Sequence, residues 1–261
     1  MRTIVVALLA GLAAAGPVAG GPPQSLATQK LGRHFGAFTG CLVLHDIGRN
    51  HVLRINDAQC STRLPPGATF HPYLALVALE TGVGRGAAVT AAGDDAPPAE
   101  AEDSEKIDVP AALRSGARAP FQDIARQIGA ERLGWWLDTA PFGNRDMSGG
   151  LTEFWSDSTL ALTANEQDYF WTQLYASALP FRPEVAEAVR QALTISATDD
   201  TEFAGASATG AQERLGWFVG HARSINGEFV IVVNIEGDHG ATGAKAQEIA
   251  VAILKDRRIL R

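Results

Sequence analysis

The stretch that decides the fold is Leu64-Pro65-Pro66-Gly67-Ala68-Thr69-Phe70-His71-Pro72, which leads directly into the apolar run from Tyr73 to Glu80. The prolines and the glycine favour a turn at its start. The run that follows is apolar on every side up to Glu80, which is typical of a buried helix, and Thr81-Gly82 ends it. We therefore expect a buried helix that begins near Ala68, with the rest of the chain packed around it.

Composition and charge exclude some partners. The chain has 261 residues and a formal net charge of −7, enough length for one large domain or two small ones. A negative surface repels nucleic acids and anionic lipids, so we expect neither as a partner. The six histidines show no metal-ligand spacing with the two cysteines, and we expect no metal and no cofactor.

Residues 1–20 have the pattern of a secretory signal peptide. Arg2 precedes an apolar run from Ile4 to Ala15, and Val18-Ala19-Gly20 offers the small residues of a cleavage site. The run is too short to span a membrane; an uncleaved amphipathic anchor is the alternative. We expect a periplasmic or secreted protein that has no membrane contact after cleavage, with a flexible leader over residues 21–35.

Cys41 and Cys60 are the only cysteines of the chain. They flank a predicted hairpin, in which a strand from Ala37 to Asp46 is followed by the turn Gly48-Arg49-Asn50 and a strand from His51 to Asn56. An even pair in an exported chain favours a disulfide. Two separate buried thiols are the alternative.

The middle of the chain is predominantly helical, after an acidic segment at residues 87–106 that shows no apolar periodicity and is expected to be a disordered insert. Apolar residues recur at helical spacing over residues 121–133, and Gly129 is expected to end or bend that helix. Further helices are expected near residues 166–178, capped by Thr163 or Asn165, and from Pro183 to about Ala192.

The last third returns to strands. Residues 215–223 and 228–236 read as strands joined by Ser224-Ile225-Asn226-Gly227, and Asn-Gly between two apolar runs is a strong hairpin signal. A final helix is expected from Thr242. The order of strands, helices, strands and helix predicts an α+β fold, in which an antiparallel sheet is built from both chain ends, flanked by helices, with a helical lobe inserted in the middle.

These motifs resemble, in order and over roughly residues 36–255, the class D serine β-lactamases and related penicillin-binding proteins. The resemblance implies the same α+β fold for residues 36–261, with an active site at the lobe boundary. It also implies two catalytic positions within the first motif. Ala68 stands where the family has its nucleophilic Ser, and His71 stands where it has the Lys that is carbamylated. A methyl group cannot form an acyl-enzyme. Thr69 points about 100° away on a helix and is not expected to replace the Ser.

Two further motifs are also altered. The Ser-x-Val motif aligns with Gly116-Ala117-Arg118, although a shift of one residue would place Ser115 there. The Lys-Thr-Gly motif appears as Ala208-Thr209-Gly210, without the Lys charge. The Arg that holds the substrate carboxylate aligns with Ala246, next to Lys245, and Lys does not replace a bidentate clamp.

Other parts of the sequence keep more of the family pattern. The Tyr-Gly-Asn motif appears as Phe142-Gly143-Asn144, and Trp155 matches the Trp that packs beside the modified Lys. The resemblance implies that Phe142, Asn144, Trp155, Thr209 and Gly210 form the cleft. Trp155 also fits a core aromatic residue beside Phe154, and His71 also fits a partly buried histidine at a helix start.

Catalytic groups that act as a unit fail as a unit. We therefore expect an exported, catalytically inactive class D β-lactamase homologue. It would bind a β-lactam, a peptidoglycan-like small molecule or a protein ligand in the old cleft. The alternatives are a hydrolase of altered chemistry that uses His71 as general base, and a non-covalent binder of β-lactams. The oligomeric state is not predicted.

Overall fold

Six strands form one antiparallel sheet in the part of the chain that the computed structural model describes, which is residues 30–83, 107–156 and 159–261. The strand order is β2-β1-β6-β5-β4-β3. The bounds are β1 Thr39–Asp46, β2 His51–Ile55, β3 Thr194–Ala197, β4 Thr201–Thr209, β5 Leu215–Ser224 and β6 Gly227–Glu236. The first two strands and the last four come from opposite ends of the chain, which confirms the predicted α+β architecture.

The register of the sheet is set by two hairpins and by the pairing of the chain ends. Asp46 pairs with His51 in the first hairpin, and Ser224 pairs with Gly227 in the second. Gly227 has φ +130°, a conformation that residues with a Cβ rarely adopt. Thr39 pairs with Glu236, so β1 lies directly beside β6.

The residue pattern alone did not predict β3 and β4. Strand β4 has the sequence Thr-Glu-Phe-Ala-Gly-Ala-Ser-Ala-Thr, whose small residues give a weak strand signal. The packing explains them: a Cβ at Gly205 would collide with the ring of Phe218, and a Cβ at Gly243 would lie 2.8 Å from the backbone nitrogen of Ala208. Close packing therefore requires a glycine at position 205 on β4, against β5, and a glycine at position 243 at the start of the last helix, against the β4 backbone.

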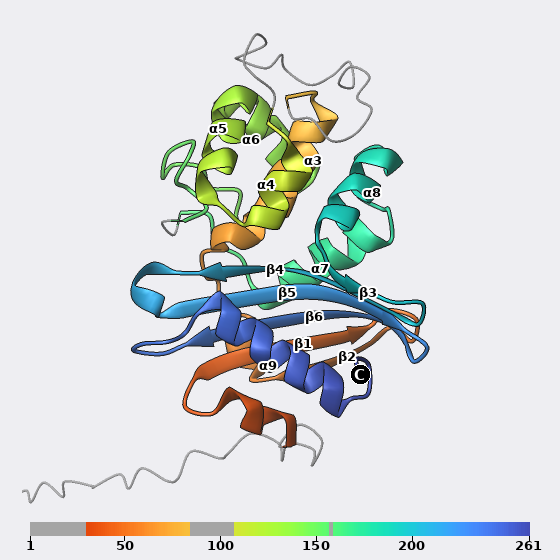
Figure 1. Ribbon diagram of the computed structural model, residues 1–261. Helices are drawn as coiled ribbons and strands as arrows, with labels where there is room; N and C mark the ends of the chain where they lie inside the picture. Colours follow the sequence, from red (N-terminus) through yellow and green to blue (C-terminus); the bar gives the residue numbers. More distant parts are fainter. Residues whose placement is uncertain (1–29, 84–106, 157–158) are drawn as a thin grey trace, which may run out of the picture.

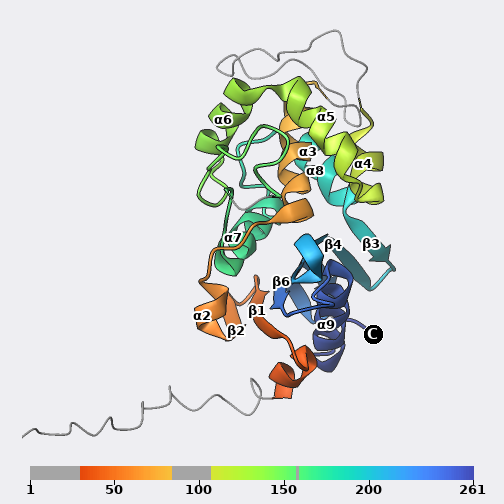
Figure 2. The ribbon, with the colours of Figure 1, turned by 90° about the vertical axis from the view of Figure 1, so that its left-hand side faces the viewer.

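A helical lobe covers one face of the sheet, and one helix covers the other (Figures 1 and 2). At the centre of the lobe, α3 has every residue buried, as its all-round apolar sequence predicted. The lobe contains α3 His71–Glu80, α4 Val109–Ser115, α5 Arg118–Ile128, α6 Ala130–Thr139, α7 Ala164–Tyr175 and α8 Pro183–Ala192.

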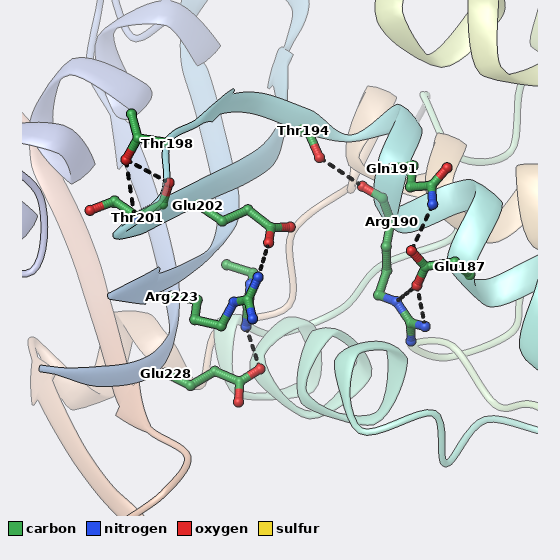
Figure 3. A network of polar contacts seen from close by, with 10 residues as sticks. Glu187, Arg190, Gln191, Thr194, Thr198, Thr201, Glu202, Arg223 and Glu228 are labelled. Atoms are coloured by element: carbon green, nitrogen blue, oxygen red, sulfur yellow. Dashed lines mark hydrogen bonds and ion pairs between the residues drawn. The ribbon is translucent and has the colours of Figure 1, made fainter. Parts of the chain in front are cut away.

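The expected helix ends are confirmed. Gly129, with φ +82°, ends α5 and starts α6. Thr163 caps α7 in a capping box with Glu166, and Pro183 lies in the first turn of α8. The end of α8 leads into β3, and Figure 3 shows the Arg190–Glu187 ion pair within α8 and the Arg223–Glu202 ion pair between β5 and β4.

The opposite face of the sheet is covered by α9, Gly243–Asp256, which Thr242 caps as expected. A second apolar core lies between α9 and the sheet. Leu31 and Phe35 are buried in this core, and Phe35 is the last residue of the short helix η1 (Arg33–Phe35). Of the predicted flexible leader over residues 21–35, the structure describes only residues 30–35, and the burial of Leu31 and Phe35 departs from the prediction for that part.

The predicted disulfide is confirmed. Cys41 on β1 is bonded to Cys60 at the end of the short helix α2 (Asp57–Cys60), with 5.2 Å between the Cα atoms. The predicted signal peptide at 1–20, the leader up to residue 29 and the acidic insert at 87–106 lie outside the described residues. Within the described ranges, no helix is both long and apolar enough to cross a membrane.

Candidate functional site

A cleft of about 320 Å³ lies where the helical lobe meets the end of β4. Its floor is the short helix η2 (Gly67–Phe70) and the start of α3, and η2 packs against β4 and β5. The turn between α4 and α5 forms one wall, and the end of β4 with the short helix η3 (Ala211–Glu213) forms the other. The residues that line the cleft are Pro65, Pro66, Gly67, Ala68, His71, Gly116, Arg118, Trp155, Ser156, Ala208, Thr209, Gly210, Ala211, Leu215 and Trp217.

The floor is held by one backbone hydrogen bond and one side-chain hydrogen bond, which come from opposite sides. Gly67 N donates to the Trp155 carbonyl at 2.8 Å, and Trp217 Nε1 donates to the Pro65 carbonyl at 3.0 Å. Gly67 has φ +54°, which favours glycine. The segment from Pro65 to Gly67, which the sequence predicted as a turn, is thus held between β5 on one side and the helical lobe on the other.

Ala68 lies half-buried in the cleft, where the family resemblance predicted the nucleophile position. Its neighbour Thr69 does not replace a nucleophile. The Thr69 hydroxyl donates to the Pro66 carbonyl at 2.8 Å and accepts from Gln167 Nε2 at 2.7 Å, in the fully buried interior. At the position that the resemblance assigns to the nucleophile, the side chain in the cleft is therefore a methyl group.

His71 also lies in the cleft, but its imidazole is largely buried. The ring stacks on Phe121 with 4.0 Å between centroids and an interplanar angle of 12°, and its Nε2 has no hydrogen-bond partner. Burial, followed by the nearby guanidinium of Arg118, lowers the pKa of His71 to about 3. A neutral imidazole with so low a pKa is a weak base at neutral pH.

The wall formed by the α4–α5 turn resolves the ambiguity in the second motif. Gly116 lines the cleft and Ser115 does not. The Ser115 hydroxyl instead donates to the Ala112 carbonyl at 2.8 Å and accepts from Ala117 N at 3.2 Å, as part of the end of α4. Arg118, at the first position of α5, is the residue of this motif that brings a charge to the cleft.

The β4 wall carries Ala208, Thr209 and Gly210, as the resemblance implied. Thr209 Oγ1 accepts a hydrogen bond from Gly243 N at 2.9 Å, so the hydroxyl also joins β4 to the start of α9. Lys245 forms an ion pair with Glu248 at 2.9 Å, and Ala246 is fully buried in the second core. Neither residue lines the cleft.

Two of the predicted cleft residues lie outside it. Phe142 is buried in the core, with its ring 5.2 Å from Phe70 and 5.1 Å from Phe170. Asn144 joins two loops, since its Nδ2 donates to the Thr159 carbonyl at 2.7 Å and its Oδ1 accepts from Ala161 N at 3.0 Å. Phe142 and Asn144 support the cleft from behind. Trp155 does line it, while fully buried, so both expectations for that residue are met.

The sequence did not single out Trp217, Leu215 or Ser156. The signal for Trp217 is the β-strand alternation: it pairs with Ala208 across β4 and β5, so both side chains face the lobe. Ser156 follows Trp155 directly. Among the described residues that line the cleft, Ser156 and Thr209 are the ones that carry hydroxyls.

The site has the shape of a ligand cleft. The positions that the resemblance assigns to the nucleophile, the base and the sheet cation hold Ala68, His71 and Ala208, and burial lowers the pKa of His71 to about 3. Residues 40–255 match the family described as the penicillin binding protein transpeptidase domain. The chain belongs to the class D β-lactamase and penicillin-binding protein family.

Individual relatives divide between enzymes and receptors. The chain is 31% identical over 217 residues to the "Probable beta-lactamase YbxI" of Bacillus subtilis, covering 83% of this chain and 80% of that protein. The crystal structure of a class D β-lactamase from Bacillus subtilis is 29% identical with a TM-score of 0.77, covering 88% of this chain and 96% of that one.

One receptor among the relatives is BlaR from Bacillus licheniformis. The C-terminal domain of this penicillin-receptor is 26% identical with a TM-score of 0.77, and the match covers 88% of this chain and 96% of that domain. Against the full-length regulatory protein BlaR1, the chain is 27% identical over 226 residues but spans only 37% of its length. The matched part of BlaR1 is therefore about the size of one domain.

Proposed function

We propose that this protein is an exported ligand-binding member of the class D family that has lost acyl transfer, and that it acts as a receptor or regulatory protein through the cleft. The observation that carries the proposal is the methyl group of Ala68 beside the neutral, stacked imidazole of His71. Without a hydroxyl and a base, the cleft can still bind, because its walls and its volume of about 320 Å³ suit a small ligand. The penicillin-receptor among the relatives supports a β-lactam or a peptidoglycan-like fragment as the ligand class.

Two features support export. The N-terminal pattern is that of a signal peptide, and the Cys41–Cys60 disulfide suits an oxidising compartment. We therefore propose a periplasmic or secreted location, where the cleft would meet β-lactams and cell-wall fragments directly. Mass spectrometry of the chain purified from the periplasm tests this, since cleavage near Gly20 removes the first residues.

Intact-mass spectrometry with a penicillin and with a carbapenem tests the loss of acyl transfer. We expect no covalent adduct on the native protein, and none on Ala68→Ser, because a restored hydroxyl still lacks a base at position 71. An adduct on the native protein would contradict the proposal, and peptide mapping would then examine Ser156 and Thr209. Thermal melting in parallel is expected to show a rise in Tm with ligand concentration, since ligands that bind only the folded state stabilise it.

The variant His71→Ala tests the alternative of a hydrolase based on this histidine. The alternative predicts some hydrolysis by the native protein and its loss in the variant. Our proposal predicts no hydrolysis by either protein above the rate in buffer. The low pKa of His71 weighs against the alternative, because a base that is protonated only near pH 3 takes up protons poorly at neutral pH.

A further inference from the structure

The cleft has a single kind of charge among its described lining residues. Arg118 is cationic, no aspartate or glutamate lines the cleft, and the remaining side chains are apolar, neutral or hydroxyl-bearing. The Arg118 side chain is half exposed, so a ligand in the cleft can reach it. Its guanidinium also acts on the floor of the cleft, since it helps to lower the pKa of His71. The cleft therefore favours an anionic ligand group near Arg118 over a cationic one.

Arg118 has a partner that a ligand can displace. Its guanidinium forms an ion pair with Glu153, whose side chain is 36% exposed. Ion pairs this exposed are weak. Glu153 also accepts a hydrogen bond from Gln122 Nε2 at 2.6 Å, so this carboxylate keeps a partner when Arg118 turns towards a ligand.

The opposite wall offers no competing cation. Position 208 on β4 is an alanine, and the nearby Lys245 is outside the cleft and paired with Glu248. A carboxylate on a ligand is therefore attracted towards the α4–α5 turn rather than towards β4. Arginine suits this task because its guanidinium can donate two parallel hydrogen bonds to one carboxylate.

We propose that Arg118 is the anchor for a carboxylate group of the ligand, on the lobe side of the cleft, and that Glu153 holds the guanidinium in place until the ligand arrives. This inference rests on the proposed binding function and deepens it, because it makes the ligand a carboxylate-bearing small molecule. The carboxylate has two chemical sources, a β-lactam or the C-terminal carboxylate of a peptide.

Calorimetry with four probes tests the anchor and separates the two sources. The probes are benzylpenicillin, its methyl ester, N-acetyl-D-Ala-D-Ala and the amide of that peptide. We expect the native protein to bind at least one acid about tenfold more tightly than its neutral counterpart, which is the order of effect for one charge-assisted contact. The acid that shows the larger preference identifies the source.

Three variants complete the experiment. Arg118→Gln is expected to abolish the preference for the acid, whereas Lys245→Gln, a control cation outside the cleft, keeps it. Glu153→Gln is expected to tighten binding of the acid severalfold, because it removes the competing carboxylate while Gln122 remains. Circular dichroism confirms that each variant is folded.

The outcomes separate the two proposals. An acid preference that persists in Arg118→Gln, or that is lost in Lys245→Gln, overturns the anchor while the binding function stands. A native protein that binds none of the four probes overturns both. A covalent adduct with benzylpenicillin overturns the loss of acyl transfer but leaves the anchor to be judged by the variants.

Discussion

The imidazole of His71 lies face to face with the ring of Phe121, 4.0 Å away between centroids and tilted by only 12°. This stack joins the first turn of α3 to α5, and Trp155 approaches the imidazole edge-on at 6.5 Å. In this setting the imidazole behaves as an aromatic core residue. Its Nε2 is buried without a partner, so a charged His71 is strongly disfavoured in the folded state.

Stability is therefore expected to fall as the pH falls below about 6.5, the usual pKa of an unfolded histidine. Burial lowers the folded-state pKa of His71 to about 3. Between these two pKa values the unfolded state therefore binds more protons than the folded state, and lowering the pH favours unfolding. For this residue alone we expect a loss of about 2 kcal/mol in the free energy of unfolding between pH 7 and pH 5. Urea titrations at the two pH values measure it.

The variant His71→Phe tests the origin of this slope. We expect it to reduce the difference between pH 7 and pH 5, while His221, whose pKa is also lowered by burial, leaves a residual slope. His51→Phe on the exposed surface of β2 gives the effect of losing a histidine at the surface. If the native slope persists in His71→Phe, the buried imidazole is not its source.

The sequence predicted the parts of this fold whose signals are local. Gly129, Thr163 and Thr242 all mark helix ends as expected, because caps depend on neighbouring residues. It missed β4, since the glycine at 205 is explained by a distant partner, Phe218. The burial of Leu31 also depends on distant partners, because it belongs to a core that includes residues of α9 from the other end of the chain.

The same distinction holds for the site. Ala68, His71 and Ala208 were placed in the cleft by motif order, and the structure brings them together. Motif order could not separate lining residues from supporting ones. Phe142 and Asn144 belong to a conspicuous motif yet lie behind the cleft, whereas Trp217 reaches it through strand pairing alone.

Gly143 is expected to be essential for stability rather than for binding. It has φ +57°, and a Cβ there would lie 2.6 Å from the carbonyl oxygen of Ala161, which accepts the hydrogen bond of Asn144 N. Gly143→Ala is therefore expected to cost about 3 kcal/mol or more, from the strained backbone and the displaced carbonyl. Chemical denaturation of the variant measures the loss.

Gly116 provides the matched control. Its φ of +64° is nearly the same, but a Cβ there meets nothing within 4 Å. Gly116→Ala is expected to cost only about 1 kcal/mol, the strain of a left-handed backbone. Equal losses in the two variants would show that the contact with Ala161 is unimportant.

The Cys41–Cys60 disulfide closes a short loop, with a sequence separation of 19. A loop of this length is expected to contribute about 3 kcal/mol through the entropy of the unfolded chain. The double variant Cys41→Ser/Cys60→Ser should lose that amount, and its stability should no longer respond to reductant. Without reductant, a thiol-alkylating reagent should leave the native protein unmodified; modification of both cysteines would contradict the bridge.

Loss of the Trp217 side-chain hydrogen bond is expected to lower stability and to weaken the binding of every ligand, whereas loss of Arg118 is expected to affect only the preference for an acid. Trp217→Phe removes the hydrogen bond from Nε1 to the Pro65 carbonyl and is expected to cost about 1 to 3 kcal/mol, since the carbonyl loses its partner. Trp171→Phe is the matched control, because the buried Nε1 of Trp171 has no partner to lose.

Calorimetry should then show that Trp217→Phe weakens the binding of an acid and of its neutral counterpart by the same factor, because a loosened floor affects every ligand alike. If Trp217→Phe instead removes only the preference for the acid, the charge selectivity depends on the floor of the cleft as well as on Arg118.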